Sequence, residues 1–99
     1  MNKNIVKLIE YPKKGITSKE IFRNDKTDVS LFCMAKNTEM SEHTSTKKGL
    51  IYVIEGKGIF NLEGRNIKML PGVFINMNKN AKHSLKSKEN TSFLLTLIR

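Results

Sequence analysis

The chain contains only two histidines, and they are the side chains best suited to chemistry. His43 lies shortly before the apolar run at residues 49–55, and His83 follows 40 residues later, after the dipeptide Pro71-Gly72. A neutral imidazole can bind a metal ion, exchange a proton near neutral pH or hydrogen-bond a ligand. All three chemistries stay open if the fold brings the two rings together.

Short strands are the elements that must position these histidines. Apolar and polar residues alternate over short stretches that are separated by glycine, proline and asparagine, and no convincing helix stands out. We expect strands at residues 16–24, 28–36, 49–55, 59–63, 67–70, 73–77, 83–86 and 91–98. Residues 4–11 are a candidate edge strand, residues 37–41 are expected to interrupt the strands, and a short helix from Ser18 is the weaker alternative for 16–24. Pro71-Gly72 fits a type II turn. The pattern predicts an all-β sandwich or barrel.

Length and composition bound the class of protein. Ninety-nine residues make one domain with one modest core. No apolar run approaches the roughly 20 residues of a membrane span, and the first residues lack the pattern of a signal peptide. The single cysteine, Cys33, cannot form an internal disulfide, which favours the cytoplasm.

The net charge of +9 raises the question of a nucleic-acid partner. The basic residues are mostly lysines, and they occur singly or in pairs from one end of the chain to the other. Neither a basic helical stripe nor an alternation of basic and aromatic residues is present. We therefore expect a solvated lysine-rich surface rather than nucleic-acid binding.

The spacing around the first histidine resembles the first motif of the cupin family. That motif runs glycine, five residues, His-x-His, three or four residues, glutamate, six residues, glycine. On this chain its positions fall on Asn37, His43, Ser45, Gly49 and Gly56. The replacement of the opening glycine by asparagine is mild, because asparagine also tolerates a left-handed backbone. The second histidine and the glutamate of the motif are absent.

The spacing around the second histidine resembles the second cupin motif. That motif runs glycine, five residues, proline, one residue, glycine, two residues, histidine, three residues, asparagine. On this chain its positions fall on Gly72, Asn78, Asn80, His83 and Ser87. The resemblance implies one cupin domain over residues 1–99, a jelly-roll barrel with its first motif at about 37–56 and its second at about 72–87.

What the resemblance implies about a metal is incomplete. Cupin enzymes typically hold one divalent metal with three histidines and one glutamate, and here only His43 and His83 remain. Three alternatives follow: a pocket without metal in which the histidines bind a small ligand or are satisfied in the core, a weak site for Zn, Ni, Fe or Mn, and an acid–base pair without metal. No catalytic residue can be assigned from the sequence.

Strand alternation extends the predicted pocket and predicts an interface. If His43 points into the barrel, other residues of the same strand parity point inward with it. The predicted pocket set is His43, Ser45, Ile51, Val53, Met77 and His83. The opposite parity puts Leu50, Tyr52 and Ile54 on the outer face, where three apolar side chains need cover. We expect a homodimer there; the alternative is that residues 4–11 cover this face within one chain.

The combined expectation is a small cytoplasmic cupin that binds a small organic ligand in its barrel. The alternative is a metal-dependent enzyme of dioxygenase or isomerase type that uses a two-histidine site. The fold alone does not choose between them, because one architecture hosts many functions.

Overall fold

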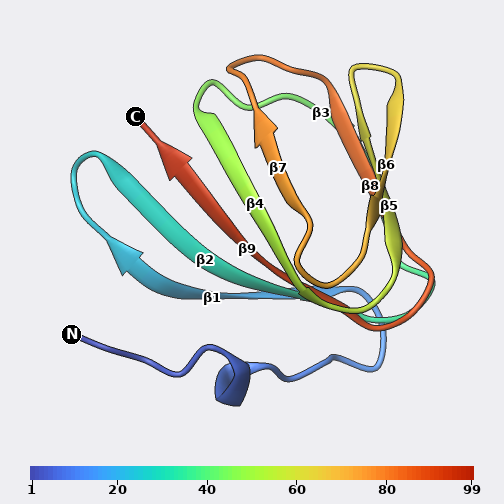
Figure 1. The fold of residues 1–99 in the computed structure, drawn as a ribbon, viewed down its shortest axis with the longest axis horizontal. Coiled ribbons are helices and arrows are strands. Elements are labelled where there is room, and N and C mark those ends of the chain that lie inside the picture. The colour runs from blue at the N-terminus through green and yellow to red at the C-terminus, as the bar shows by residue number, and fades with distance from the viewer.

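The computed structural model describes residues 1–99, which form two facing antiparallel β-sheets (Figure 1). The strands are β1 (Ile16–Arg23), β2 (Thr27–Met34), β3 (Glu39–His43), β4 (Lys48–Glu55), β5 (Gly58–Leu62), β6 (Arg65–Met69), β7 (Phe74–Met77), β8 (His83–Ser87) and β9 (Thr91–Ile98). Their order is β1-β2-β9-β4-β7 in the larger sheet and β3-β8-β5-β6 in the smaller. The predicted all-β jelly roll is confirmed. The only helical element is the 3₁₀ turn η1 (Val6–Leu8), and no helix is long and apolar enough to cross a membrane.

The inner faces of the two sheets enclose one apolar core. Its buried members are Met34, Ile51, Val53, Phe60, Met69, Ile75, Met77, Ala81, Leu85 and Phe93. β9 lies at the centre of the larger sheet, paired with β2 on one side and β4 on the other. The rings of Phe32 and Phe93 stack across the β2–β9 pair with their centroids 5.3 Å apart.

The alternation predicted for β4 is confirmed. Gly49, Ile51 and Val53 are buried on the inner face, whereas Tyr52 on the outer face is 47% exposed. Leu50 and Ile54 share the parity of Tyr52 and are half-buried. Successive side chains of a strand point to opposite faces, so one buried residue sets the direction of the rest.

Three turns follow the predicted backbone chemistry. The Val73 amide donates to the Leu70 carbonyl at 3.0 Å and Gly72 has φ 90°, which together make the type II turn. Asn37 and Asn80, which stand where the cupin motifs have glycine, have φ 62° and 63°. Asparagine therefore supplies the left-handed conformation at both positions.

Strand β3 contradicts the expected interruption at residues 37–41. It pairs with β8 and places Glu39 opposite Lys86, Met40 opposite Leu85 and His43 opposite His83, with a bulge in between. Four of the five residues of β3 are exposed, so no apolar alternation marks the strand in the sequence. β3 is a strand because its backbone pairs with β8, whereas its residue types alone do not predict a strand.

The expectation of an edge strand at residues 4–11 is also wrong. The segment forms η1 and then runs beside β1, outside the larger sheet (Figure 1). The Lys19 ammonium on β1 donates to the Leu8 carbonyl at 2.9 Å, and the Tyr11 hydroxyl donates to the Glu55 carboxylate at 2.5 Å. Burial, reinforced by this hydrogen bond, raises the pKa of Tyr11 well above its usual value, so the phenol stays protonated.

Substitution of Tyr11 by phenylalanine tests how firmly this segment is attached. The Tyr11→Phe variant loses the bond to Glu55, and we expect its free energy of unfolding to fall by about 1 kcal/mol. Urea denaturation measures the change. Tyr52→Phe on the outer face of β4 is the matched control and should change stability by much less. Equal stabilities for the two variants would contradict this attachment.

Candidate functional site

The structure brings the two histidines together in the smaller sheet. His43 at the end of β3 is the direct cross-strand partner of His83 at the start of β8. Their ring centroids lie 4.1 Å apart, and the ring planes meet at 64°. His83 is 5% exposed and stacks on Phe60, whereas His43 is exposed. One imidazole is thus buried, and the other stands beside it in contact with solvent.

Backbone carbonyls determine which ring nitrogens are free. Nδ1 of His43 lies 2.7 Å from the Ser41 carbonyl, and Nδ1 of His83 lies 3.0 Å from the Ala81 carbonyl. A carbonyl oxygen can only accept a hydrogen bond, so each Nδ1 carries the proton. Each neutral ring therefore keeps the lone pair of Nε2 for a ligand. The orienting groups come from the backbone, and no carboxylate is involved.

The environment of His83 favours its neutral form. Burial lowers the pKa of His83 below the usual value, the bond to the Ala81 carbonyl partly opposes this, and repulsion between the two rings, were both to carry a proton, lowers it further. At neutral pH the buried ring is a hydrogen-bond acceptor through Nε2.

A small cavity opens beside the two rings, between the sheets. Its volume is about 50 Å³, and ten residues line it: Phe32, Ile51, Met77, Phe93 and Leu95 from the larger sheet, and Met40, His43, Phe60, His83 and Leu85 from the smaller. A water molecule needs about 10–15 Å³ of such space, so the cavity has room for a few waters or a short apolar group. Its walls are apolar apart from the two imidazoles.

The place that the cupin motif gives to glutamate is filled by a methionine. Gly49 is buried, and a Cβ added there would lie 2.7 Å from the terminal methyl of Met77 and 3.7 Å from Leu95 and Leu97. Gly49 and Met77 are direct partners across β4 and β7. A thioether side chain therefore packs where the motif would place a carboxylate.

The donor set does not fit a resident divalent metal. No three His, Cys, Asp or Glu side chains of the chain lie close enough together to hold an ion. Two neutral imidazoles provide no negative charge, and the thioether beside them is a poor ligand for Zn, Mn or Fe(II). The side chains at this cavity are suited to hydrogen bonding and apolar contact.

Four of the six predicted pocket residues line the cavity: His43, Ile51, Met77 and His83. The structure does not bring Ser45 or Val53 there. Strand β3 ends at His43, so strand parity no longer applies to Ser45, whose hydroxyl accepts from the Lys47 amide in the following loop. Val53 is fully buried deeper in the core. Ser87, at the asparagine position of the second motif, donates to the Ala35 carbonyl at 2.6 Å and has a structural role.

Sequence reasoning missed the aromatic and aliphatic walls contributed by β2 and β9. Phe32, Phe93 and Leu95 line the cavity, and alternation along β9 could have shown that Phe93 and Leu95 share a face. It could not have shown that β9 inserts between β2 and β4, which is what turns that face toward the histidines.

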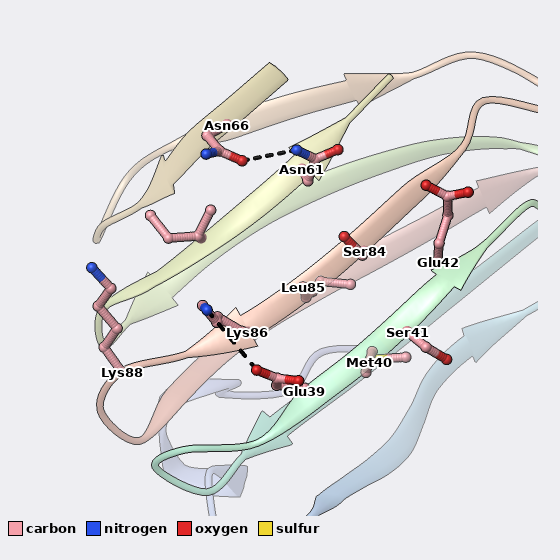
Figure 2. A pocket seen from close by; sticks show the side chains of 11 residues that line it. Glu39, Met40, Ser41, Glu42, Asn61, Asn66, Ser84, Leu85, Lys86 and Lys88 are labelled. Carbon is pink, nitrogen blue, oxygen red and sulfur yellow. Dashed lines mark hydrogen bonds and ion pairs between the residues drawn. The ribbon is translucent and has the colours of Figure 1, made fainter. Parts of the chain in front are cut away.

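A larger hollow, of about 830 Å³, lies on the outer face of the smaller sheet (Figure 2). Some of its polar side chains pair with one another: Asn61 donates to Asn66 at 2.8 Å, and Lys86 lies 3.9 Å from Glu39. It is shallow and contains neither histidine. We therefore regard the smaller cavity between the sheets as the candidate site.

The lowered pKa of His83 predicts how stability depends on pH. The folded protein takes up a proton at His83 less readily than the unfolded chain, whose pKa is near 6.5. The contribution of this ring to stability is therefore intact above that value, and it is lost as the pH falls from there to the lowered pKa of the folded state. We expect the free energy of unfolding, measured in urea from about pH 7.5 to about pH 5, to decline across this window.

The His83→Gln variant is the comparison for this experiment. The decline should be smaller in the variant, whatever the absolute stability of that protein. A wild-type stability with the same slope as His83→Gln would show that this imidazole is not desolvated in the folded state.

Solved structures share this architecture at low sequence identity. A cupin superfamily protein from Desulfitobacterium hafniense superposes with a TM-score of 0.88 at 19% identity, over 95% of this chain and 86% of that one. An RmlC-like cupin from Desulfovibrio desulfuricans gives 0.87 at 16% identity, over 99% and 95%. A cupin 2 conserved barrel domain protein from Leptotrichia buccalis gives 0.89 at 21% identity, over 98% of this chain and 47% of that longer one. No protein-family profile and no curated protein matches the sequence. The chain is thus a small domain with the cupin fold.

Proposed function

We propose that this cupin-fold protein binds a small organic molecule in the cavity beside His43 and His83. The supporting observation is the pair of Nε2 atoms, both left free by backbone hydrogen bonds at Nδ1, at the edge of an otherwise apolar cavity. Ligand sites commonly combine apolar walls with a few placed polar groups. A ligand with a short apolar part and a hydrogen-bond donor matches this arrangement.

Replacement of the exposed histidine tests this function without disturbing the core. We expect small molecules that bind at the cavity, found by screening a library against ¹⁵N-labelled protein, to bind His43→Ala about tenfold more weakly, because one acceptor is lost. Glu42→Ala is the matched control, since Glu42 is an exposed neighbour on the same strand that does not line the cavity. The Glu42→Ala variant should bind the same small molecules with wild-type affinity.

Two outcomes would contradict this proposal. One is that no library member perturbs residues of the cavity. The other is that protein purified without an affinity tag carries near-stoichiometric divalent metal that His43→Ala loses. The second result would support the alternative, a metal-dependent enzyme in which solvent or substrate completes a two-histidine site.

We further propose that the protein forms a homodimer through the outer face of β4. Tyr52 is 47% exposed and pairs with Phe74 of the edge strand β7, which is 60% exposed. Leu50 and Ile54 flank them on the same face. The N-terminal segment contacts the end of β4 through the Tyr11–Glu55 hydrogen bond, yet Tyr52 and Phe74 stay exposed. A second copy that presents the same patch is the simplest cover for these apolar side chains.

Light scattering after size exclusion tests the dimer. We expect wild-type protein to have twice the monomer mass and Tyr52→Ser to shift toward monomer, because the centre of the interface is lost. Phe22→Ser removes an aromatic ring of similar exposure, 42%, from β1 and should leave the dimer intact. A wild-type protein that is monomeric at high concentration would rule the interface out.

A further inference from the structure

A row of residues across the larger sheet connects the cavity to a charged cluster. Register pairs link Met77 to Gly49, Gly49 to Leu97, Leu97 to Asp28 and Asp28 to Arg23. Asp28 has the parity of Phe32 and Met34, which face the inside of the barrel. The row therefore runs along the inner face, from the methionine beside the two histidines to a carboxylate on β2.

The Asp28 carboxylate is surrounded by three cations from distant parts of the chain. Arg99 Nη2 lies 2.6 Å from one oxygen, Arg23 Nε lies 3.2 Å from the other, and Lys47 Nζ lies 3.8 Å from the first. The Asp28 side chain is only 18% exposed. This is a partly desolvated cluster, in which charges interact more strongly than at a fully exposed surface.

The cluster has more positive than negative charge. Three cations against one carboxylate leave a local excess of two positive charges. Glu20 lies 3.9 Å from Arg23, and its side chain is 64% exposed. When this second carboxylate is counted, the cluster still has an excess of one positive charge. Lys47 makes the longest of the three contacts with Asp28 and no other ion pair. Its ammonium is the least neutralised of the three cations.

Lys47 lies in the loop that joins His43, at the end of β3, to the start of β4. It precedes β4, yet its ammonium reaches Asp28 on β2, so the side chain crosses β9, which lies between those strands. Two strand spacings, roughly 10 Å, separate Gly49 from Asp28. The Lys47 side chain therefore spans the distance from the start of β4, next to Gly49, to the charged cluster around Asp28.

We propose that Lys47, Arg99 and Arg23 form an anion-binding lip and that the ligand of the cavity is a small organic acid. Its carboxylate would bind the cations at the lip, and its short chain, which carries a hydroxyl or amide donor for the Nε2 atoms, would enter the cavity beside His43 and His83. This inference rests on the proposed function and narrows it to one chemical class. Guanidinium and ammonium groups recognise carboxylates through charge-assisted hydrogen bonds, and about 50 Å³ of apolar space limits the rest of the molecule to a few carbons.

Butyrate and its neutral amide, butyramide, separate the role of charge from the role of the apolar chain. Each is titrated into ¹⁵N-labelled full-length protein, and amide shifts are followed. We expect butyrate to shift amides of both the cavity and the lip, and to bind about tenfold more tightly than butyramide, because only butyrate engages the cations.

Two neighbouring lysines provide a matched pair of variants. Lys47→Gln removes the ammonium at the lip, and we expect it to weaken butyrate binding about tenfold while leaving butyramide unchanged. Lys48→Gln makes the same change of net charge one residue later, where the parity of Leu50 and Tyr52 directs the side chain outward. It should leave both affinities unaltered.

The outcomes distinguish this inference from the function on which it rests. Equal binding of butyrate and butyramide at the cavity, or equal effects of Lys47→Gln and Lys48→Gln, would overturn the anionic class and leave ligand binding standing. Absence of shifts with both probes would overturn this inference, whereas ligand binding itself is decided by the library screen described above. Lip shifts that occur without cavity shifts would reduce the cluster to a surface anion site and also overturn the inference.

Discussion

The register of β9 between β2 and β4 is the constraint on which the rest of the structure depends. Because side chains alternate along a strand, a slip of one residue would exchange its inner and outer sets. The observed register turns Phe93 and Leu95 toward the cavity and Ser92 toward the outer face. The same register carries the chain on to Arg99 beside Asp28. One strand therefore sets the cavity wall and the charge beside it together.

The histidine pair depends on a second, weaker constraint. β3 is a short edge strand with a bulge, and its pairing with β8 is what puts His43 beside His83. Both rings are then oriented by carbonyls two residues earlier in the chain, Ser41 and Ala81. Such local hydrogen bonds hold a ring in place without any partner from elsewhere in the fold. The arrangement leaves the Nε2 acceptor of the buried His83 in a largely apolar environment, where a matching donor is favoured, and that of His43 open to solvent.

Much of the fold could be predicted from the sequence, and less of the site. Period-two alternation identified the strands with one buried face, such as β4, and the turn residues identified Pro71-Gly72. β3 was not predicted, because an exposed edge strand has no such alternation. The cupin spacing located both histidines, but it could not say that Met77 fills the space beside Gly49. The cations around Asp28 come from residues 23, 47 and 99, and only tertiary structure brings them together.

The central place of β9 also has a kinetic consequence. Strands β2 and β4, which flank it, cannot complete the sheet until β9 has formed, because their partners in β9 lie 37 to 71 residues further along the chain, and such distant pairings form slowly. Until then both strands present unpaired backbone edges and apolar side chains, which are templates for association with other chains. Before β9 inserts, the folding chain is therefore most prone to aggregate. A higher concentration of folding chains would increase this aggregation.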